Sequence, residues 1–434
     1  MSTMNFQPYI NIGCLGSVSD GKSTLVEKLT GVKTQRHSEE KLRNITKNQG
    51  YANMKIWLDS TDSPDSPDSP DRLDKSDSMN YYTTDTIPIT FKNEEDTECT
   101  LVNHVSFVDC PGHQELIKVM LSSIALMDGA IVVVSVDQPL ANKPQLIQHL
   151  AAAKLGRLQK IIVCMNKIDL VKKDILIQRK QELDAMLESY DIRPYAVIPT
   201  CFNKKIGLKY VVKAIMELFN PADFVDRTTT APLFRISRSF DINKPGTNWT
   251  DVIGGVVGGS LMSGQLNTDD EIEIRPGMVS CRDGKFTCVP IRTSVVSIKT
   301  DTTELTEIVP GGLIGIRTDS DPHYCRANKL AGQVAGLVGT LPNVYSEISL
   351  PIQMVTTFGN NWKPTVKDAV SIQIGTQMTD ASVISVGSKI KFSFKSPVCV
   401  SDNQHIIICK IIDKILRIVA EGTVLYSDNT YPLI

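Results

Sequence analysis

The sequence predicts an α/β domain with a mainly parallel sheet, followed by two β-barrel domains. In the first half of the chain, apolar strand-like runs alternate with helical ones, as in a parallel sheet covered by helices. After Pro221, short strands follow one another between Gly, Pro, Asp and Asn turns, which is typical of a barrel. A second strand-rich block begins near Leu341. We therefore expect domains at residues 1–226, 227–342 and 343–434.

The expected elements follow the hydrophobic runs in chain order. In the first domain, strands are expected at 10–15, 101–109, 129–136, 160–165 and 195–199. Helices are expected from Lys22 onward and at 114–127, 143–155 and 172–189. In the barrels, strands are expected at 233–240, 252–258, 271–275, 289–298, 312–317, 371–375, 385–394 and 404–419.

Composition narrows the class of protein. The chain has 434 residues, 41% of them hydrophobic, and a net charge of −2, which argues against a protein that coats nucleic acid through bulk charge. No apolar run approaches the ~18 residues of a membrane span, and the first residues lack a signal-peptide pattern, so we expect a cytoplasmic protein with no membrane partner. The ten cysteines form no C-x-x-C pair, which predicts free thiols, no disulfide and no zinc.

One segment, residues 59–78, differs sharply in composition. It repeats Ser-Pro-Asp three times and carries almost no apolar side chains. Such a segment cannot offset the entropy lost on ordering, so we predict disorder. A Ser-Pro phosphorylation tract and weak divalent-cation binding by the clustered carboxylates are the open alternatives.

The most specific motif, G-x-x-x-x-G-K-[ST], starts at Gly16, directly after the first expected strand. Its glycines let backbone N–H groups turn toward phosphate oxygens at the start of a helix. In this motif Lys22 reaches the β- and γ-phosphates and the Ser23 hydroxyl binds Mg²⁺. We expect nucleotide contacts from Ser19, Asp20, Gly21, Lys22, Ser23 and Thr24.

Two further motifs narrow the nucleotide to GTP. Asp109-Cys110-Pro111-Gly112 ends a strand, where Asp109 can hold Mg²⁺ through water and the Gly112 N–H can approach the γ-phosphate. Asn166-Lys167-Ile168-Asp169 ends another strand, where Lys167 would lie along the base. Asp169 can accept two hydrogen bonds from guanine that adenine cannot donate.

Three weaker candidates complete the set. Thr46 is the candidate switch threonine, binding Mg²⁺ and sensing the γ-phosphate. Thr200-Cys201-Phe202 lies where backbone N–H groups can cap the guanine oxygen; alone it would be an ordinary loop. His113 is the candidate catalytic residue, orienting the attacking water, although a lone histidine is more often a helix cap. No arginine finger is evident near these motifs, which predicts slow GTP hydrolysis, accelerated about 10³- to 10⁵-fold by an activating protein.

A GTPase domain followed by two barrels resembles the translation factors related to elongation factor Tu. Longer phrases resemble the gamma subunit of eukaryotic and archaeal translation initiation factor 2, densely over residues 9–345 and more thinly beyond. These phrases lie at 31–34, 43–46, 50–56, 238–247, 254–260, 270–277 and 325–334.

The resemblance implies GTP-dependent binding of initiator methionyl-tRNA and its delivery to the small ribosomal subunit as the core subunit of the factor. GTP hydrolysis to GDP would then accompany start-codon selection. The implied partners are the alpha and beta subunits, an activating protein and a nucleotide-exchange factor. By the same resemblance, Tyr51 is the candidate aromatic contact for tRNA, and it could equally be a core residue.

Several positions depart from the family pattern. Ser17, Ser19 and Asp20 replace its usual phosphate-loop residues, and Asp20 could weaken nucleotide affinity if it faces the phosphates. Residues 59–78 lie where relatives often carry a zinc knuckle, so zinc is not carried over, and the apolar segment 406–426 puts tRNA contact by the second barrel in doubt. The alternatives are an elongation-type tRNA carrier, a GTPase of sulfate activation, or a scaffold that binds nucleotide without turnover.

Overall fold

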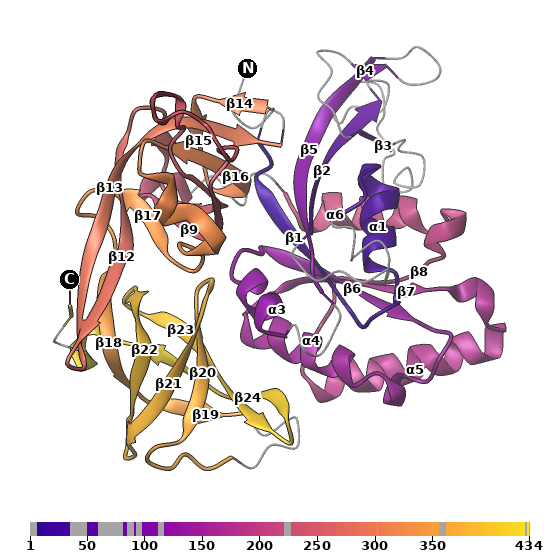
Figure 1. The fold of residues 1–434 in the computed structure, drawn as a ribbon. Helices are drawn as coiled ribbons and strands as arrows, with labels where there is room; N and C mark the ends of the chain where they lie inside the picture. Colours follow the sequence, from indigo (N-terminus) through magenta and orange to yellow (C-terminus); the bar gives the residue numbers. More distant parts are fainter. Residues whose placement is uncertain are drawn as a thin grey trace. The chain divides into compact units, whose positions relative to one another are not determined.

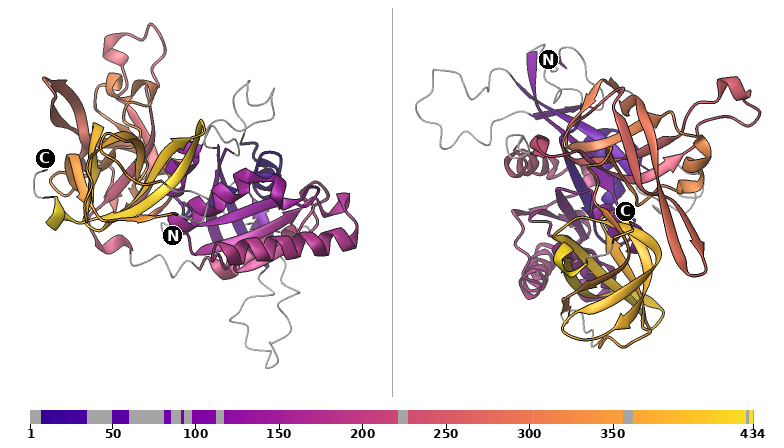
Figure 2. Two further views of the ribbon diagram at one scale, coloured as in Figure 1. Left: turned by 90° about the horizontal axis from the view of Figure 1, so that it is seen from below. Right: turned by 90° about the vertical axis from the view of Figure 1, so that its left-hand side faces the viewer.

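The structure is a computed structural model. It describes residues 7–34, 50–59, 81–84, 91–92, 98–111, 117–220, 227–301, 303–355, 362–429 and 432–433. The described residues divide into two compact units: those within 1–112, 128–146 and 159–225 belong to the first, and those within 113–127, 147–158 and 226–434 to the second. Figures 1 and 2 show a sheet with helices in the first part of the chain and strands alone in most of the rest.

The first unit is built on an eight-stranded sheet in the order β3-β2-β5-β1-β6-β7-β8, with β4 paired to β5. Neighbours run parallel from β5 through β1, β6 and β7 to β8, whereas β2, β3 and β4 are antiparallel. The strands are β1 Ile10–Leu15, β2 Gly50–Asp59, β3 Tyr81–Thr84, β4 Phe91–Lys92, β5 Glu98–Asp109, β6 Gly129–Ser135, β7 Lys160–Asn166 and β8 Ala196–Pro199. Because parallel strands end at one edge, the loops after β1, β5, β7 and β8 meet there.

Helices α1 and α6 pack on one face of this sheet through an apolar core that includes Leu25, Phe107 and Val211. Helix α5 lies along the opposite face (Figure 1). The helices of the described residues are α1 Lys22–Thr30, α3 Ile117–Ile124, α4 Pro144–Leu155, α5 Lys173–Ser189 and α6 Leu208–Leu218. The predicted parallel sheet is confirmed, and α6 and β2 to β4 are elements that the sequence analysis did not predict.

The second unit contains two seven-stranded antiparallel sheets. The first has the order β12-β17-β9-β10-β16-β13-β14, and pairing of β12 with β13 closes it into a barrel. A short pair, β11 Leu266–Asn267 with β15 Glu307–Ile308, accompanies it. Its strands are β9 Leu233–Phe240, β10 Val256–Ser263, β12 Glu271–Arg282, β13 Lys285–Thr300, β14 Thr303–Leu305, β16 Gly311–Thr318 and β17 Val334–Leu337.

The second sheet has the order β18-β22-β21-β20-β23-β24-β19 and buries an apolar core that includes Tyr345 and Phe392. The expected strand-rich stretch 404–419 forms two strands, β23 and β24, because Asp413 and Lys414 make a two-residue turn between them, both with positive φ. The strands are β18 Asn343–Leu350, β19 Ile352–Met354, β20 Ala369–Ile374, β21 Gln377–Ser385, β22 Ile390–Val400, β23 Gln404–Ile412 and β24 Ile415–Val424.

The order of an α/β domain before strand-rich domains is as predicted, whereas the three domain boundaries stay a prediction. Residues 60–78 of the acidic segment lie outside the described residues. All ten cysteines carry free thiols. Among the described residues, no helix combines the length and the apolar character needed to cross a membrane.

Candidate nucleotide-binding site

The predicted phosphate loop connects β1 to α1, and two of its glycines are required by close contacts. A Cβ atom on Gly16 would lie 2.2 Å from the backbone oxygen of Val133, and φ at Gly16 is +137°. A Cβ atom on Gly21, whose φ is +106°, would lie 2.4 Å from Nδ2 of Asn166. Only glycine adopts these conformations and leaves this space. The loop is therefore fixed between β6 and the end of β7.

Lys22 and Ser23, at the start of α1, lie as the phosphate-loop motif requires. The Lys22 ammonium is buried and donates a 2.7 Å hydrogen bond to the backbone oxygen of Ser17, across the loop. Burial lowers the pKa of Lys22, and the nearby carboxylates of Asp109 and Asp20 oppose that shift. Thr24 follows Ser23 in the same helical turn.

The predicted metal ligands Ser23 and Asp109 are brought together from α1 and the end of β5. Ser23 Oγ donates to Asp109 Oδ2 at 2.7 Å, and Thr34 Oγ1 donates to the same oxygen at 2.6 Å. Among the described residues, no group of three His, Cys, Asp or Glu side chains forms a metal cluster. A hydroxyl and a carboxylate fit Mg²⁺, which takes few protein ligands and completes its shell with water and phosphate oxygens.

Asn166 connects the phosphate loop to the loop after β8. Its Nδ2 donates to the backbone oxygen of Asp20 at 2.8 Å, and its Oδ1 accepts from the backbone N–H of Phe202 at 3.2 Å. The neighbouring Lys167 has positive φ and donates to Asp137 Oδ2 at 2.9 Å. One amide thus holds two of the predicted nucleotide loops in register.

Asp169, the predicted guanine-binding residue, lies at the surface beside Cys201 and Lys204. Hydrogen bonds from the Cys201 thiol and from Lys204, whose Nζ is 3.0 Å from Oδ2, lower the pKa of Asp169. Burial and the bond to Asp169 raise the pKa of Cys201. The Asp169 carboxylate is therefore ionised at neutral pH, in the acceptor form that the N1–H and amine of guanine need.

The backbone N–H groups of 200–202 already donate within the protein. Thr200 N–H donates to Met165 O at 2.7 Å, Cys201 N–H to Ile206 O at 3.0 Å and Phe202 N–H to Asn166 Oδ1. Phe202 and Cys201 are buried. In this structure the loop is therefore held by protein contacts, and its capping of the guanine oxygen stays a prediction.

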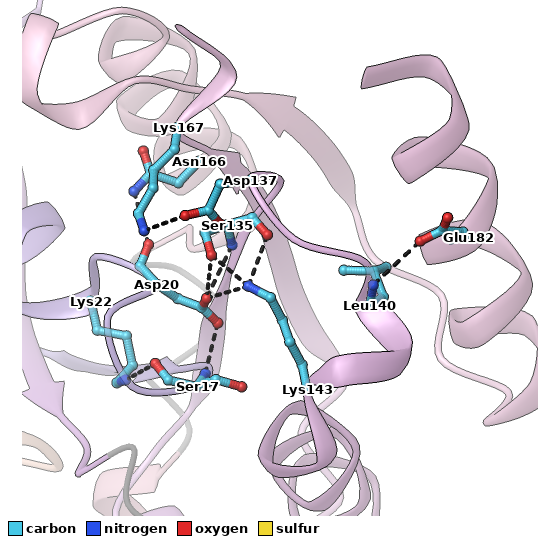
Figure 3. Close-up of polar contacts among 10 residues, drawn as sticks. All are labelled: Ser17, Asp20, Lys22, Ser135, Asp137, Leu140, Lys143, Asn166, Lys167 and Glu182. Carbon is cyan, nitrogen blue, oxygen red and sulfur yellow. Dashed lines mark hydrogen bonds and ion pairs between the residues drawn. The ribbon is translucent and has the colours of Figure 1, made fainter. Parts of the chain in front are cut away.

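The Asp20 carboxylate, an unusual group in a phosphate loop, is buried and fully engaged by protein donors (Figure 3). Its Oδ2 accepts from the backbone N–H of Ser17 at 2.8 Å. Its Oδ1 accepts from the Ser135 hydroxyl at 2.6 Å and lies 2.5 Å from the ammonium of Lys143. Ser19, just before it, has positive φ and completes the turn.

The remaining predicted residues are less closely defined. Thr46, Gly112 and His113 lie outside the described residues. Tyr51 is half-buried in β2, paired with Val108 of β5, and its contact with RNA stays a prediction. Sequence reasoning missed three residues that hold the site: Thr34, Ser135 and Lys143.

Comparison with known proteins agrees with this site. The model of the elongation factor Tu GTP binding domain matches residues 7–221, and that of the initiation factor eIF2 gamma C-terminal domain matches residues 352–424. The fold and the phosphate and guanine motifs thus define a translational GTPase with an elongation factor Tu-like GTP-binding domain.

Curated relatives identify the family. The chain is 34% identical to the eukaryotic translation initiation factor 2 subunit gamma of Encephalitozoon cuniculi (strain GB-M1), over 98% of this chain and 94% of that protein. It is 35% identical to subunit 3 of the same factor from Drosophila melanogaster, over 99% of this chain and 91% of that protein. The chain belongs to the family of translation initiation factor 2 gamma subunits.

Solved structures support the fold. Elongation factor SelB from Methanococcus maripaludis, in complex with the GTP analogue GppNHp, matches with a TM-score of 0.69 and 18% identity, over 97% of this chain and 79% of that one. A bacterial selenocysteine-specific elongation factor, EF-Sec, matches with a TM-score of 0.68 and 17% identity, over 96% of this chain and 58% of that one.

Proposed function

We propose that this GTPase binds initiator methionyl-tRNA in its GTP state and delivers it to the small ribosomal subunit as the core subunit of initiation factor 2. Hydrolysis of GTP then accompanies start-codon selection. The observation that carries this proposal is sequence identity of 34% and 35% to two gamma subunits of that factor, over nearly the full length of the chain. The joined phosphate and guanine loops supply the nucleotide site that such a switch needs.

The site residues take separate roles in this proposal. Ser23, Thr46 and, through water, Asp109 would hold Mg²⁺, which would supply positive charge to neutralise the phosphates. The base is recognised by Asn166, Lys167 and Asp169, with residues 200–202 beside it. His113 orients the attacking water, while Gly112 senses the γ-phosphate. The phosphates are bound by residues 19–24.

The proposed partners follow from the family. They are the alpha and beta subunits of the factor, the small ribosomal subunit, an activating protein and an exchange factor. Because the protein would deliver tRNA to the ribosome, we expect it to act in the cytoplasm. A tRNA that is held only in the GTP state requires different affinities for the two nucleotide states, because a partner with equal affinity for both senses nothing.

A filter-binding experiment tests this function. The full chain, assembled with its alpha and beta subunits, is mixed with initiator or elongator methionyl-tRNA in the presence of GTP analogue or GDP. We expect retention of initiator tRNA with the GTP analogue to exceed each of the three other pairings by about 10-fold or more, a usual size for coupling between sites. Equal retention with GTP analogue and GDP, or a preference for elongator tRNA, would overturn the proposal.

The same preparation tests the proposed catalytic residue. His113→Ala should lower single-turnover GTP hydrolysis, stimulated by ribosomal subunits and activating protein, by about 10²- to 10⁴-fold, the usual contribution of one such group. GDP affinity serves as the control and should not change. Unaltered hydrolysis in the variant would show that His113 is not the catalytic residue. The conclusion from the tRNA filter-binding experiment would not be affected.

A further inference from the structure

An ion pair is buried behind the phosphate loop. Asp20 comes from the loop itself, and Lys143 comes from the turn that leads into α4 (Figure 3). The exposed fractions of their side chains are 1% and 6%. The two residues are 123 positions apart in the chain, so the contact is created by the fold alone. A buried pair of this kind behaves as a unit, because loss of one partner leaves an uncompensated charge.

The pair is satisfied on all sides. The Lys143 ammonium donates to the backbone oxygen of Ser135 at 2.8 Å and to the Ser135 hydroxyl, which in turn donates to Asp20. Ser135 is the last residue of β6, which ends beside the phosphate loop. Complete hydrogen bonding of both charges is the condition under which a buried pair is tolerated. The pair therefore ties the loop to the end of β6 and the start of α4.

Asp20 also sets the backbone of the loop. Its carboxylate accepts from the Ser17 N–H, and its backbone oxygen is held by Asn166. The backbone oxygen of Ser17 then accepts from Lys22, the residue that reaches the phosphates in this motif. The carboxylate of Asp20 is thus connected to the main phosphate-binding lysine through two hydrogen bonds and one intervening residue, Ser17. A negative charge at this place repels a di- or triphosphate unless it is neutralised.

We propose that Lys143 is a positioning residue for the nucleotide: it neutralises Asp20 and holds the phosphate loop in its binding conformation. The proposal rests on the GTP-binding role of the loop. Lys143 acts through Asp20 and Ser135 rather than on the phosphates directly. A lysine here makes an acidic phosphate loop compatible with an anionic ligand, so Asp20 and Lys143 are required together.

The test is a double-mutant cycle with ligands of different charge. The full chain carrying Lys143→Met, Asp20→Asn or both is titrated with GDP and, by competition, with guanosine. Lys143→Met should weaken GDP binding by about 30-fold or more, because a buried carboxylate is left unpaired beside the phosphates. Guanosine carries no phosphate, so its affinity should fall no more than about 3-fold. The double variant should recover most of the GDP affinity.

The controls separate charge from fold. Lys154→Met removes an exposed lysine from α4 and should leave GDP affinity unchanged. Lys143→Arg keeps the charge and should bind GDP far better than Lys143→Met. If the Met variant does not fold, the GDP affinity of Lys143→Arg is compared with that of the wild type instead. The proposal is overturned if GDP and guanosine lose affinity equally, if the double variant is as weak as Lys143→Met, or if Lys143→Arg loses 30-fold. A wild-type chain that binds no GDP would instead contradict the assigned GTP site.

Discussion

The two ends of the nucleotide site are built on opposite principles. At the phosphate end, Asp20 and Lys143 are buried, and each forms a hydrogen bond with Ser135. At the guanine end, Asp169 pairs with Lys204, whose side chain is 60% exposed, so water screens the interaction. The same kind of contact, a carboxylate with an ammonium, therefore fixes the phosphate loop at one end. At the other end it holds the Asp169 side chain only weakly.

The difference has a functional reason. A phosphate cradle must keep several N–H groups aimed at one place, which favours a rigid, buried support. A base-recognition carboxylate must release its protein partners and accept two hydrogen bonds from guanine instead, which favours an exposed, weakly held pair. Binding of one nucleotide thus requires a rigid phosphate loop at Asp20 and an Asp169 carboxylate that is accessible to guanine.

The largest effect that we predict concerns guanine selection. Asp169→Asn should reduce GDP affinity on the order of 10³-fold, because the acceptor that pairs with the N1–H and amine of guanine is lost. Xanthosine diphosphate, which has an oxygen in place of the amine, should bind better to the variant than to the wild type. Isothermal titration with both nucleotides measures this.

Asp174→Asn, at an exposed carboxylate early in α5, is the matched control and should change neither affinity. If GDP affinity survives in Asp169→Asn, the exposed end does not choose the base, and the comparison of the two ends fails.

A second prediction separates crowding from backbone strain at the phosphate end. Gly21→Ala and Gly31→Ala both place alanine at positive φ, which costs each about 1–2 kcal/mol. Only Gly21 also faces a close neighbour, Asn166 Nδ2, whereas no atom lies within 4 Å of the Cβ position at Gly31. Gly21→Ala should therefore lower the thermal midpoint more and weaken GDP binding by about 10-fold or more. Equal effects of the two variants in calorimetry and titration would show that the contact with Asn166 is unimportant.

The smallest effect is expected for the exposed pair. Lys204→Ala should change GDP affinity by less than about 3-fold, and the change should shrink as salt is raised, because exposed charges are screened. Titrations at low and high ionic strength provide the measurement, with Lys180→Ala, at another exposed and ion-paired lysine on α5, as the control. A salt-insensitive loss of more than 10-fold would place Lys204 in the same class as Lys143.

The fold was largely predictable because its strands carry local signals. Apolar runs marked β1, β6 and β7 within one residue of their observed ends. The strand β2 was not assigned, although its 50–59 run pairs along almost the whole of β5. Helix α6 was also missed, even though it buries Val211, Val212 and Ile215 at helical spacing. In both cases the sequence itself carries the pattern that predicts the element.

The site was predictable where the chemistry is local. The phosphate and guanine motifs place their residues within a few positions of one another, so their spacing carries the information. Lys143 could not be found this way, since its partner Asp20 is 123 residues away and no motif joins them. The two-residue turn at Asp413 and Lys414 was missed because lysine is rare where φ is positive.

The two hydrogen bonds of the Asn166 side chain have a consequence for nucleotide exchange. One side chain supports the Asp20 backbone at the phosphate loop and the Phe202 backbone beside the base. The two ends of a bound nucleotide are therefore mechanically linked through a single amide. A protein that displaces this side chain during GDP release therefore frees the Asp20 backbone and the Phe202 backbone together, while the Asp20–Lys143 pair still supports the phosphate loop from behind.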